Sequence, residues 1–311
     1  MKLVTFEHNG NRHIGALLAD TGIISDFTAS EPSAPHFRDM LSLIDGGGDA
    51  LGEALCLVER PKIQVPYSAA RLLAPVPKPR QMRDFLCFEK HLRQARANRY
   101  LFGIGDRAID PANVEVPAIW YEQPIYYKCN RFSVIGPEQD VQWPRYCKVL
   151  DYELEFGIFV GVGGKNIRRE DAHKHVFGYC IFNDFSARDA QMREMQGQLG
   201  PAKGKDFDTG NVLGPWLVTA DEIPNPYSLD MIARVNGEEW SRGNSAEMTH
   251  KFEDILVHAS SDETLHAGEF FGSGTVGNGC GLELGRFLQP GDVIELEVKG
   301  LGVLRNRVVS N

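Results

Sequence analysis

Two glutamates spaced two residues apart are the strongest chemical feature of the sequence. They are Glu153 and Glu155 in the run YELEFGIFV, which has the composition of a strand. Alternate side chains of a strand share a face, so the two carboxylates project together while Leu154 and Phe156 take the other face. Two interpretations stay open. Either water screens the pair on a solvated strand face, or a hard divalent cation such as Mg²⁺, Mn²⁺ or Ca²⁺ neutralises it.

A third acid follows at the point where another apolar strand ends. Asp184 closes the run VFGYCIFND, and the polar segment SARDAQ comes directly after it. An aspartate in that position can cap a turn or a helix. It can also be a ligand, because binding groups concentrate at strand ends and in loops. Both interpretations stay open on this segment alone.

An aspartate and a histidine seven residues apart form the next pair. Apolar residues at helical spacing predict a helix from Asp84 to about Arg99, which places Asp84 and His91 on one helix face. A lone histidine beside an apolar face is more often structural than catalytic. Here residues 100–117 follow without any clear period, and we expect them to form a lid that covers a general base.

A lysine and a glycine-rich turn could handle an anion. Lys205, in the run GPAKGKDFDTGN, could stabilise negative charge that develops on a metal-bound anion, although most such lysines are solvated. Residues 272–277, GSGTVG, match the dinucleotide-binding glycine pattern, but no crossover helix follows, so that interpretation is disfavoured. We expect backbone N–H groups of this turn, or Thr275, to face a ligand carboxylate. The sequence contains neither a serine-hydrolase elbow nor a zinc-protease motif.

The elements that must position these residues are mostly strands. Apolar or alternating runs predict strands at 153–161, 176–184, 212–219, 230–240 (a hairpin about Asn236 and Gly237), 268–274 and 292–309. Strands and helices do not alternate regularly, which disfavours a doubly wound fold.

The first 75 residues read as a smaller unit. A hairpin about Asn9 and Gly10 and two helical patterns, at 36–44 and 49–60, precede Pro75, Pro77 and Pro79. We therefore expect a mixed α/β fold, mostly β, with a small N-terminal α+β domain over residues 1–75 and a catalytic domain over residues 76–311.

Composition limits the partners. The 311-residue chain has 33 basic and 42 acidic residues, and its formal charge of −9 disfavours nucleic acid and anionic lipid. The six cysteines are scattered, and no apolar run approaches the ~20 residues needed to span a bilayer. The N-terminus lacks the apolar region of a signal peptide. We expect a cytoplasmic protein that binds neither nucleic acid nor membrane.

Four segments, in order along the chain, resemble the fumarylacetoacetate hydrolase family: DYELEFG, GYCIFNDFSARDAQ, GKDFDTGNVLGPWLV and GSGTVG. The resemblance covers about residues 75–311. It implies a mixed β-roll catalytic domain behind a smaller N-terminal domain, usually assembled as a homodimer, with a small anionic keto acid as substrate.

The resemblance also implies residue roles. The implied metal ligands are Glu153, Glu155 and Asp184, with Asp84 as a fourth, holding Mg²⁺ or alternatively Mn²⁺ or Ca²⁺. The implied catalytic residues are His91, Glu283, which would orient the histidine, and Lys205. Gln191, Thr275 and Tyr127 would lie on the substrate side. Leu86 and Met195 stand where fumarylacetoacetate hydrolase has tyrosines, so we expect a different substrate.

The predicted activity is divalent-metal-dependent hydrolysis of a carbon–carbon bond in a small 1,3-diketo acid, in the catabolism of aromatic compounds. His91 would activate the water. The alternative is isomerisation, decarboxylation or dehydration of a keto acid, each of which needs only a metal-stabilised enolate. A non-catalytic metal-binding protein is the third hypothesis.

Overall fold

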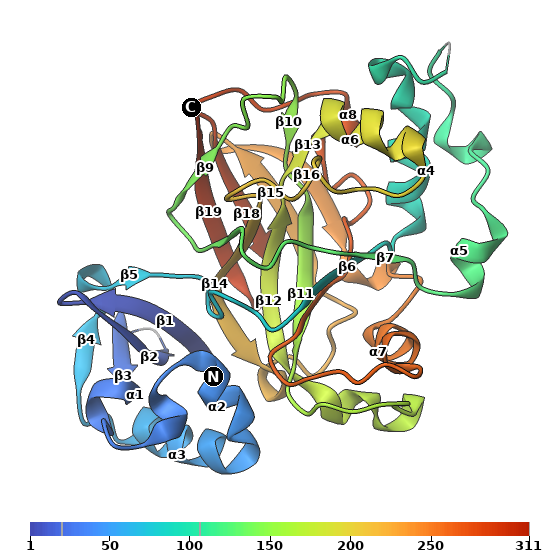
Figure 1. Cartoon of the computed structure of the whole chain (residues 1–311). Helices are drawn as coiled ribbons and strands as arrows, with labels where there is room; N and C mark the ends of the chain where they lie inside the picture. The colour runs from blue at the N-terminus through green and yellow to red at the C-terminus, as the bar shows by residue number, and fades with distance from the viewer. Residues whose placement is uncertain (20, 106, 311) are drawn as a thin grey trace.

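Strands dominate the computed structural model, which describes residues 1–19, 21–105 and 107–310 (Figure 1). The strands are β1 (Lys2–His8), β2 (Asn11–Leu18), β3 (Ile23–Asp26), β4 (Gln64–Pro66), β5 (Arg71–Leu72), β6 (Met82–Phe85), β7 (Tyr126–Lys128), β8 (Val134–Ile135), β9 (Asp140–Gln142), β10 (Leu150–Asp151), β11 (Leu154–Val160), β12 (Val176–Asp184), β13 (Ser186–Ala187), β14 (Asn211–Thr219), β15 (Asp230–Val235), β16 (Glu238–Asn244), β17 (Phe270–Gly272), β18 (Val293–Val298) and β19 (Gly302–Val309). The α-helices are α1 (Phe27–Ser30), α2 (Met40–Asp45), α3 (Gly47–Glu59), α4 (Glu89–Ala97), α5 (Ala118–Glu122), α6 (Arg188–Glu194), α7 (Phe252–Ser260) and α8 (Gly281–Leu284).

Two main sheets are formed by the described residues. The larger runs β4-β3-β2-β1-β14-β12-β11-β17-β6-β7, with β5 paired to β1 and β8 to β14. The smaller runs β16-β15-β18-β19-β9 and packs on the larger through β15, β18 and β19. The mixed α/β, mostly β fold expected from the sequence is confirmed.

Strand β11 is buried on both faces, which explains its nearly continuous apolar sequence. Phe156 and Ile158 point into a core shared with the smaller sheet. Phe159 points the other way, into a core that the N-terminal helices complete with Leu43 and Phe27. The predicted strand at 153–161 is therefore correct. Because a core lies on each side of β11, the direction in which each of its side chains points is fixed.

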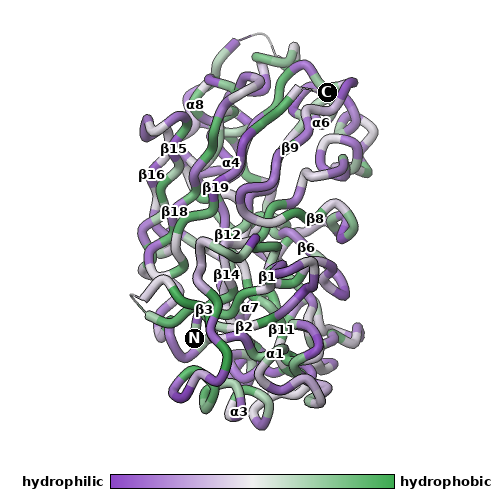
Figure 2. Tube along the Cα trace, turned by 90° about the vertical axis from the view of Figure 1, so that its left-hand side faces the viewer, coloured by the Kyte–Doolittle hydropathy of each residue, from purple (hydrophilic) through white to green (hydrophobic). Residues whose placement is uncertain are grey.

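The N-terminal segment forms the predicted hairpin and helices. Strands β1 and β2 pair about Asn9 and Gly10, and α2 and α3 follow. Strand β1 also pairs with β14, at Lys2 opposite Val218, so the sheet continues into the larger part of the chain. Helix α3 and the C-terminus lie toward opposite ends of the molecule (Figure 2). The division at residue 75 stays a prediction.

The predicted helix from Asp84 to Arg99 is wrong in its first part. Residues Met82–Phe85 form β6, which pairs with both β17 and β7, and the helix α4 begins only at Glu89. Pairing on both edges overrides the helical spacing of the apolar side chains. Asp84 and His91 therefore do not share a helix face.

The other structural expectations are met in part. The hairpin of β15 and β16 turns at Asn236 and Gly237, as predicted. Residues 100–117 contain short 3-10 turns at Arg99–Phe102 and Pro111–Asn113, while residue 106 lies outside the described residues, so the lid stays a prediction. All six cysteines are free. None of the helices in the described ranges has the length and apolar character needed to cross a membrane.

Candidate metal centre and active-site pocket

Three carboxylates meet at one end of the large sheet. Asp84 on β6, Glu155 on β11 and Asp184 on β12 each place an oxygen within 4.8 Å of the others. Glu155 pairs with Phe182 across β11 and β12, so it shares a face with Asp184, two residues further along β12. Asp84 reaches the same face because it pairs with Gly272 of β17, the strand between β6 and β11. We call these three residues the carboxylate triad.

Burial raises the pKa of every member of the triad. Burial and the charge of Asp184 raise the pKa of Asp84 to about 8. Burial raises the pKa of Asp184 to about 6, against the opposing effect of Lys205. Burial, followed by the charge of Asp84, holds the pKa of Glu155 well above its usual range. Three buried acids that disfavour each other's ionisation form a site that a cation would stabilise.

The triad fits a hard divalent cation. Glu155 Oε2 and Asp184 Oδ1 are buried and have no hydrogen-bond partner within the described part of the chain. Buried carboxylate oxygens without a partner are costly, and carboxylate oxygen is the ligand that Mg²⁺, Mn²⁺ and Ca²⁺ prefer. Gly272 leaves the space open, since a Cβ there would lie 2.5 Å from Asp84 Oδ1.

Glu153 lies beside the triad and is held by two cations. Lys205 Nζ donates to Glu153 Oε2 and, at 2.6 Å, to Asp184 Oδ2. Arg188 donates to Glu153 Oε1 at 2.8 Å. Burial opposes ionisation of Glu153, but Lys205 and Arg188 outweigh it and lower its pKa to about 2. Its role as a metal ligand stays a prediction.

The structure decides two of the open alternatives. Glu153 is only 4% exposed and Glu155 is fully buried, so the interpretation as a solvated strand face is wrong. The N-cap of α6 is Ala187, and the side chain of Asp184 instead binds Lys205 and Tyr127, so the interpretation of Asp184 as a cap of α6 is wrong too.

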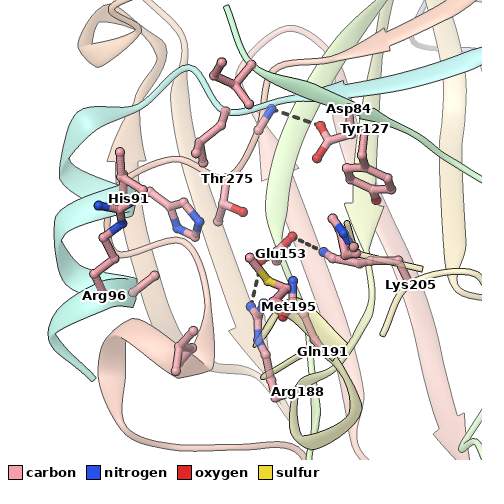
Figure 3. A pocket seen from close by; sticks show the side chains of 18 of the residues that line it. Asp84, His91, Arg96, Tyr127, Glu153, Arg188, Gln191, Met195, Lys205 and Thr275 are labelled. Atoms are coloured by element: carbon pink, nitrogen blue, oxygen red, sulfur yellow. Dashed lines mark hydrogen bonds and ion pairs between the residues drawn. The ribbon is translucent and has the colours of Figure 1, made fainter. Parts of the chain in front are cut away.

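A cavity of about 260 Å³ opens in front of these residues (Figure 3). Asp84, Glu153 and Lys205 contribute to its lining, and α4 contributes His91 from another side. Its remaining walls are largely apolar and include Leu86, Leu92, Ile125, Met192, Met195 and Leu282. The two residues that differ from the tyrosines of fumarylacetoacetate hydrolase, Leu86 and Met195, thus both face the cavity.

His91, which lines the cavity, is paired with Glu283. His91 Nδ1 and Glu283 Oε1 are 3.0 Å apart, and both residues are buried. If Nδ1–H donates to the carboxylate, Nε2 keeps its lone pair. The contact between His91 and Glu283 that the family resemblance implies is present, and the catalytic roles of the two residues stay predictions.

The three predicted substrate-side residues also lie at the cavity. Tyr127 donates its hydroxyl to Asp184 Oδ2 at 2.6 Å, and Thr275 donates to Glu155 Oε1 at 3.2 Å. Gln191 accepts a hydrogen bond from Arg188 at 2.9 Å. Each of them contacts a polar group of the site, and their roles toward a substrate stay predictions.

Four charged residues at the site had no predicted role from the sequence. Arg188 is 2% exposed and donates to Asp151 as well as to Glu153, and Asp151 accepts backbone N–H groups at the start of α8. Arg188 stands in the SARDAQ segment and Asp151 in DYELEFG, so the family resemblance could have pointed to both. Arg96 and Arg99 line the cavity from α4 and the turn after it, and no motif marked them.

Known proteins resemble the chain over nearly its whole length. Residues 81–309 match the family model described as the fumarylacetoacetate (FAA) hydrolase C-terminal domain. The mitochondrial oxaloacetate tautomerase fahd2 of Xenopus laevis is 34% identical over 316 residues, which cover 99% of this chain and 90% of that protein. The human mitochondrial oxaloacetate tautomerase FAHD2A is 32% identical over 315 residues, with 99% and 92% covered.

Solved structures give the same result. Fumarylacetoacetate hydrolase from Exiguobacterium antarcticum superposes with a TM-score of 0.76 at 27% identity, and the match covers 100% of both chains. A probable 2-hydroxyhepta-2,4-diene-1,7-dioate isomerase from Mycobacterium abscessus gives a TM-score of 0.74 at 27% identity, covering 100% of this chain and 99% of that one. From the family model and relatives that span nearly its whole length, the chain belongs to the fumarylacetoacetate hydrolase family.

Proposed function

We propose that the protein is a divalent-metal-dependent enzyme that interconverts the keto and enol forms of oxaloacetate or a similar 2-keto dicarboxylate. One observation carries the proposal: Asp84 of the buried carboxylate triad, Lys205 and His91 line a single cavity, and Glu283 lies 3.0 Å from His91. Relatives 31–34% identical over 99% of this chain are named oxaloacetate tautomerases, which supports this reaction over the hydrolysis expected from the sequence.

The residues of the site have separate tasks in this reaction. A divalent ion held by Asp84, Glu155 and Asp184 would supply Lewis acidity toward the keto oxygen. His91 Nε2 takes a proton from the carbon next to the keto group and returns it to the enolate oxygen, while Glu283 stabilises the charged imidazole. Lys205, whose pKa is raised by Asp184 and Glu153 against the effect of burial, stays charged and stabilises the enolate.

The test follows the two forms directly. Enol oxaloacetate is added to the protein with Mg²⁺ or Mn²⁺, and the loss of its ultraviolet absorbance is compared with the buffer rate. We expect His91→Asn to lower the catalysed rate by roughly 10²–10⁴-fold. Cation affinity, measured by calorimetry, should stay within about threefold of the parent value, because His91 is not part of the triad. A rate equal to that of buffer alone would overturn the proposal.

Hydrolysis of a 1,3-diketo acid is the second candidate function. The apolar wall with Leu86 and Met195 favours it, because this wall would accommodate an acyl chain that oxaloacetate lacks. Acylpyruvates are incubated with the metal-loaded protein, and the masses of the products are measured by mass spectrometry. Two fragments that sum to substrate plus water would identify hydrolysis, whereas an unchanged mass leaves tautomerisation as the reaction.

Two further expectations belong with this proposal. We propose that the protein works as a homodimer, in keeping with the usual assembly of its family, and that its natural cation is Mg²⁺. Light scattering of the purified protein and metal analysis of protein purified without added metal test these two points separately.

A further inference from the structure

A second group of metal-binding side chains lies next to the carboxylate triad. A ring nitrogen of His91, Cys280 Sγ and a carboxylate oxygen of Glu283 lie within 4.8 Å of one another, and all three residues are buried. Nδ1 is the ring nitrogen that contacts Glu283, at 3.0 Å. They come from α4 and from the start of α8. Their donors are nitrogen, sulfur and oxygen, whereas the triad offers only oxygen. A mixed set that includes a thiolate suits Zn²⁺, while Mg²⁺ prefers oxygen alone.

The three donors are close to the spacing that zinc requires. Tetrahedral zinc with bonds of about 2.0–2.3 Å separates its ligands by roughly 3.4–3.8 Å. Donors that already lie within 4.8 Å need to close by only about 1 Å to reach that geometry. His91 lines the cavity, so an ion can arrive from that side and keep a fourth position for water.

Helix capping does not explain why a sulfur atom stands at this position. Cys280 is the N-cap of α8: its Sγ accepts from the backbone N–H of Glu283, and Glu283 Oε2 accepts from the N–H of Cys280 at 3.1 Å. Serine, threonine, aspartate and asparagine are the preferred caps, and a thiol is a weak acceptor. A serine would cap α8 at least as well, so capping does not account for the thiol, which lies buried against Met192 and Leu282.

We propose that His91, Cys280 and Glu283 form a second cation site, selective for Zn²⁺ and similar thiophilic ions, and that its occupation inhibits the enzyme. Cys280 binds as a thiolate and releases its proton to solvent. The ion replaces the hydrogen bond between His91 Nδ1 and Glu283. The single proton of neutral imidazole then resides on Nε2, so His91 has no lone pair with which to accept a proton from the substrate.

The inhibition rests on the proposed function, whereas the binding does not. Binding is therefore measured first, with Co²⁺ as a spectroscopic probe and with Mg²⁺ in large excess to occupy the triad. We expect one Co²⁺ per chain and a thiolate-to-cobalt absorption band in the near ultraviolet. Zn²⁺ should displace the Co²⁺ and remove the band.

The variant Cys280→Ser separates this site from the triad, because it removes sulfur and keeps a good N-cap. Its Co²⁺ band should be absent. With Mg²⁺ present, it should need at least tenfold more Zn²⁺ than the parent to halve its own zinc-free rate. Cys56→Ser is the matched control, since Cys56 is exposed. It should keep both the band and the zinc sensitivity of the parent.

The outcomes are distinct. A parent protein without the cobalt band, or a Cys280→Ser variant with an unchanged band, would overturn the second site. Equal zinc sensitivity of the parent and Cys280→Ser would overturn the inhibitory role. Absence of any keto–enol activity would count against the proposed function alone, because the cobalt band reports binding without turnover. Thermal unfolding of Cys280→Ser checks that the variant is folded.

Discussion

At the scale of single residues, two arginines that line the cavity have no acidic partner among the described residues. Arg96 and Arg99 are half-buried, and neither forms an ion pair with an acid among the described residues. Burial lowers the pKa of Arg99, and burial together with the charge of Arg99 lowers that of Arg96. Half-buried guanidinium groups without a carboxylate partner favour an anion nearby. A dicarboxylate substrate would bring one.

This arrangement predicts the effect of Arg99→Ala. If Arg99 receives the second carboxylate of oxaloacetate, its loss should raise the KM for oxaloacetate about tenfold or more, since a hydrogen bond to a charged group contributes about 1.5–3 kcal/mol. The kcat should change little, because the proton is transferred elsewhere in the cavity. Steady-state kinetics with a monocarboxylate 2-keto acid alongside oxaloacetate measures the difference.

The matched control is Arg93→Ala on α4, the helix that precedes Arg99. Arg93 is bound to Glu89 at 2.7 Å and does not line the cavity. Its replacement should leave both KM values near those of the parent. If Arg99→Ala raised the KM equally for mono- and dicarboxylates, Arg99 would not be the contact for the second carboxylate.

At the scale of elements, the register of the large sheet builds the triad. The face that carries Glu155, Asp184 and Asp84 is apolar further along the strands, where Phe159 and Phe182 pack against the N-terminal helices. The acids appear only where those strands end. Strand β17 lies between β11 and β6, and it presents Gly272 at this level, without any side chain.

Gly272 is therefore expected to be a sensitive position for cation binding. An added Cβ would lie 2.5 Å from Asp84 Oδ1 and 3.3 Å from Glu155 Oε2, so Gly272→Ala pushes the carboxylates apart. We expect at least a tenfold loss of Mn²⁺ affinity, measured by calorimetry. Gly52→Ala in α3 is the control, because a Cβ there meets nothing within 4 Å and alanine favours the helix. Unchanged Mn²⁺ affinity in Gly272→Ala would contradict this account of the site.

The sequence predicted the positions of the strands more reliably than it predicted their pairing and their long-range contacts. Glu155 and Asp184 could be recognised because both lie in long apolar strands with a clear period or a clear end. Asp84 was identified by its seven-residue spacing to His91, yet it lies on a strand, because pairing with β17 and β7 is a non-local effect. The contacts of Arg188 with Asp151 join segments 37 residues apart, and no local pattern reveals them.

At the scale of the whole molecule, the formal charge of −9 and the buried triad both favour the binding of cations. A net negative chain attracts cations weakly over its whole surface, and salt screens that attraction within about 8–10 Å. The triad differs because its acids are buried, with Glu155 and Asp184 fully shielded from water. We therefore expect the triad to bind a cation specifically, and monovalent salt to affect this binding little.

Binding at the triad must then stabilise the whole fold. The triad joins β6, β11 and β12, and its first and last members, Asp84 and Asp184, are 100 residues apart in the sequence, so an ion held there binds the folded chain and not the unfolded one. At a free-cation concentration of about 100 times the Kd, this linkage adds about 2.7 kcal/mol to the free energy of unfolding. We expect Mn²⁺ to raise the unfolding temperature by several degrees, and chelator to reverse the change.

The same ionic strength supplied as KCl should give no comparable shift in unfolding temperature. Asp184→Asn, which removes one charge of the triad, should abolish most of the gain from Mn²⁺. A shift of the same size in Asp184→Asn would place the stabilising ion elsewhere.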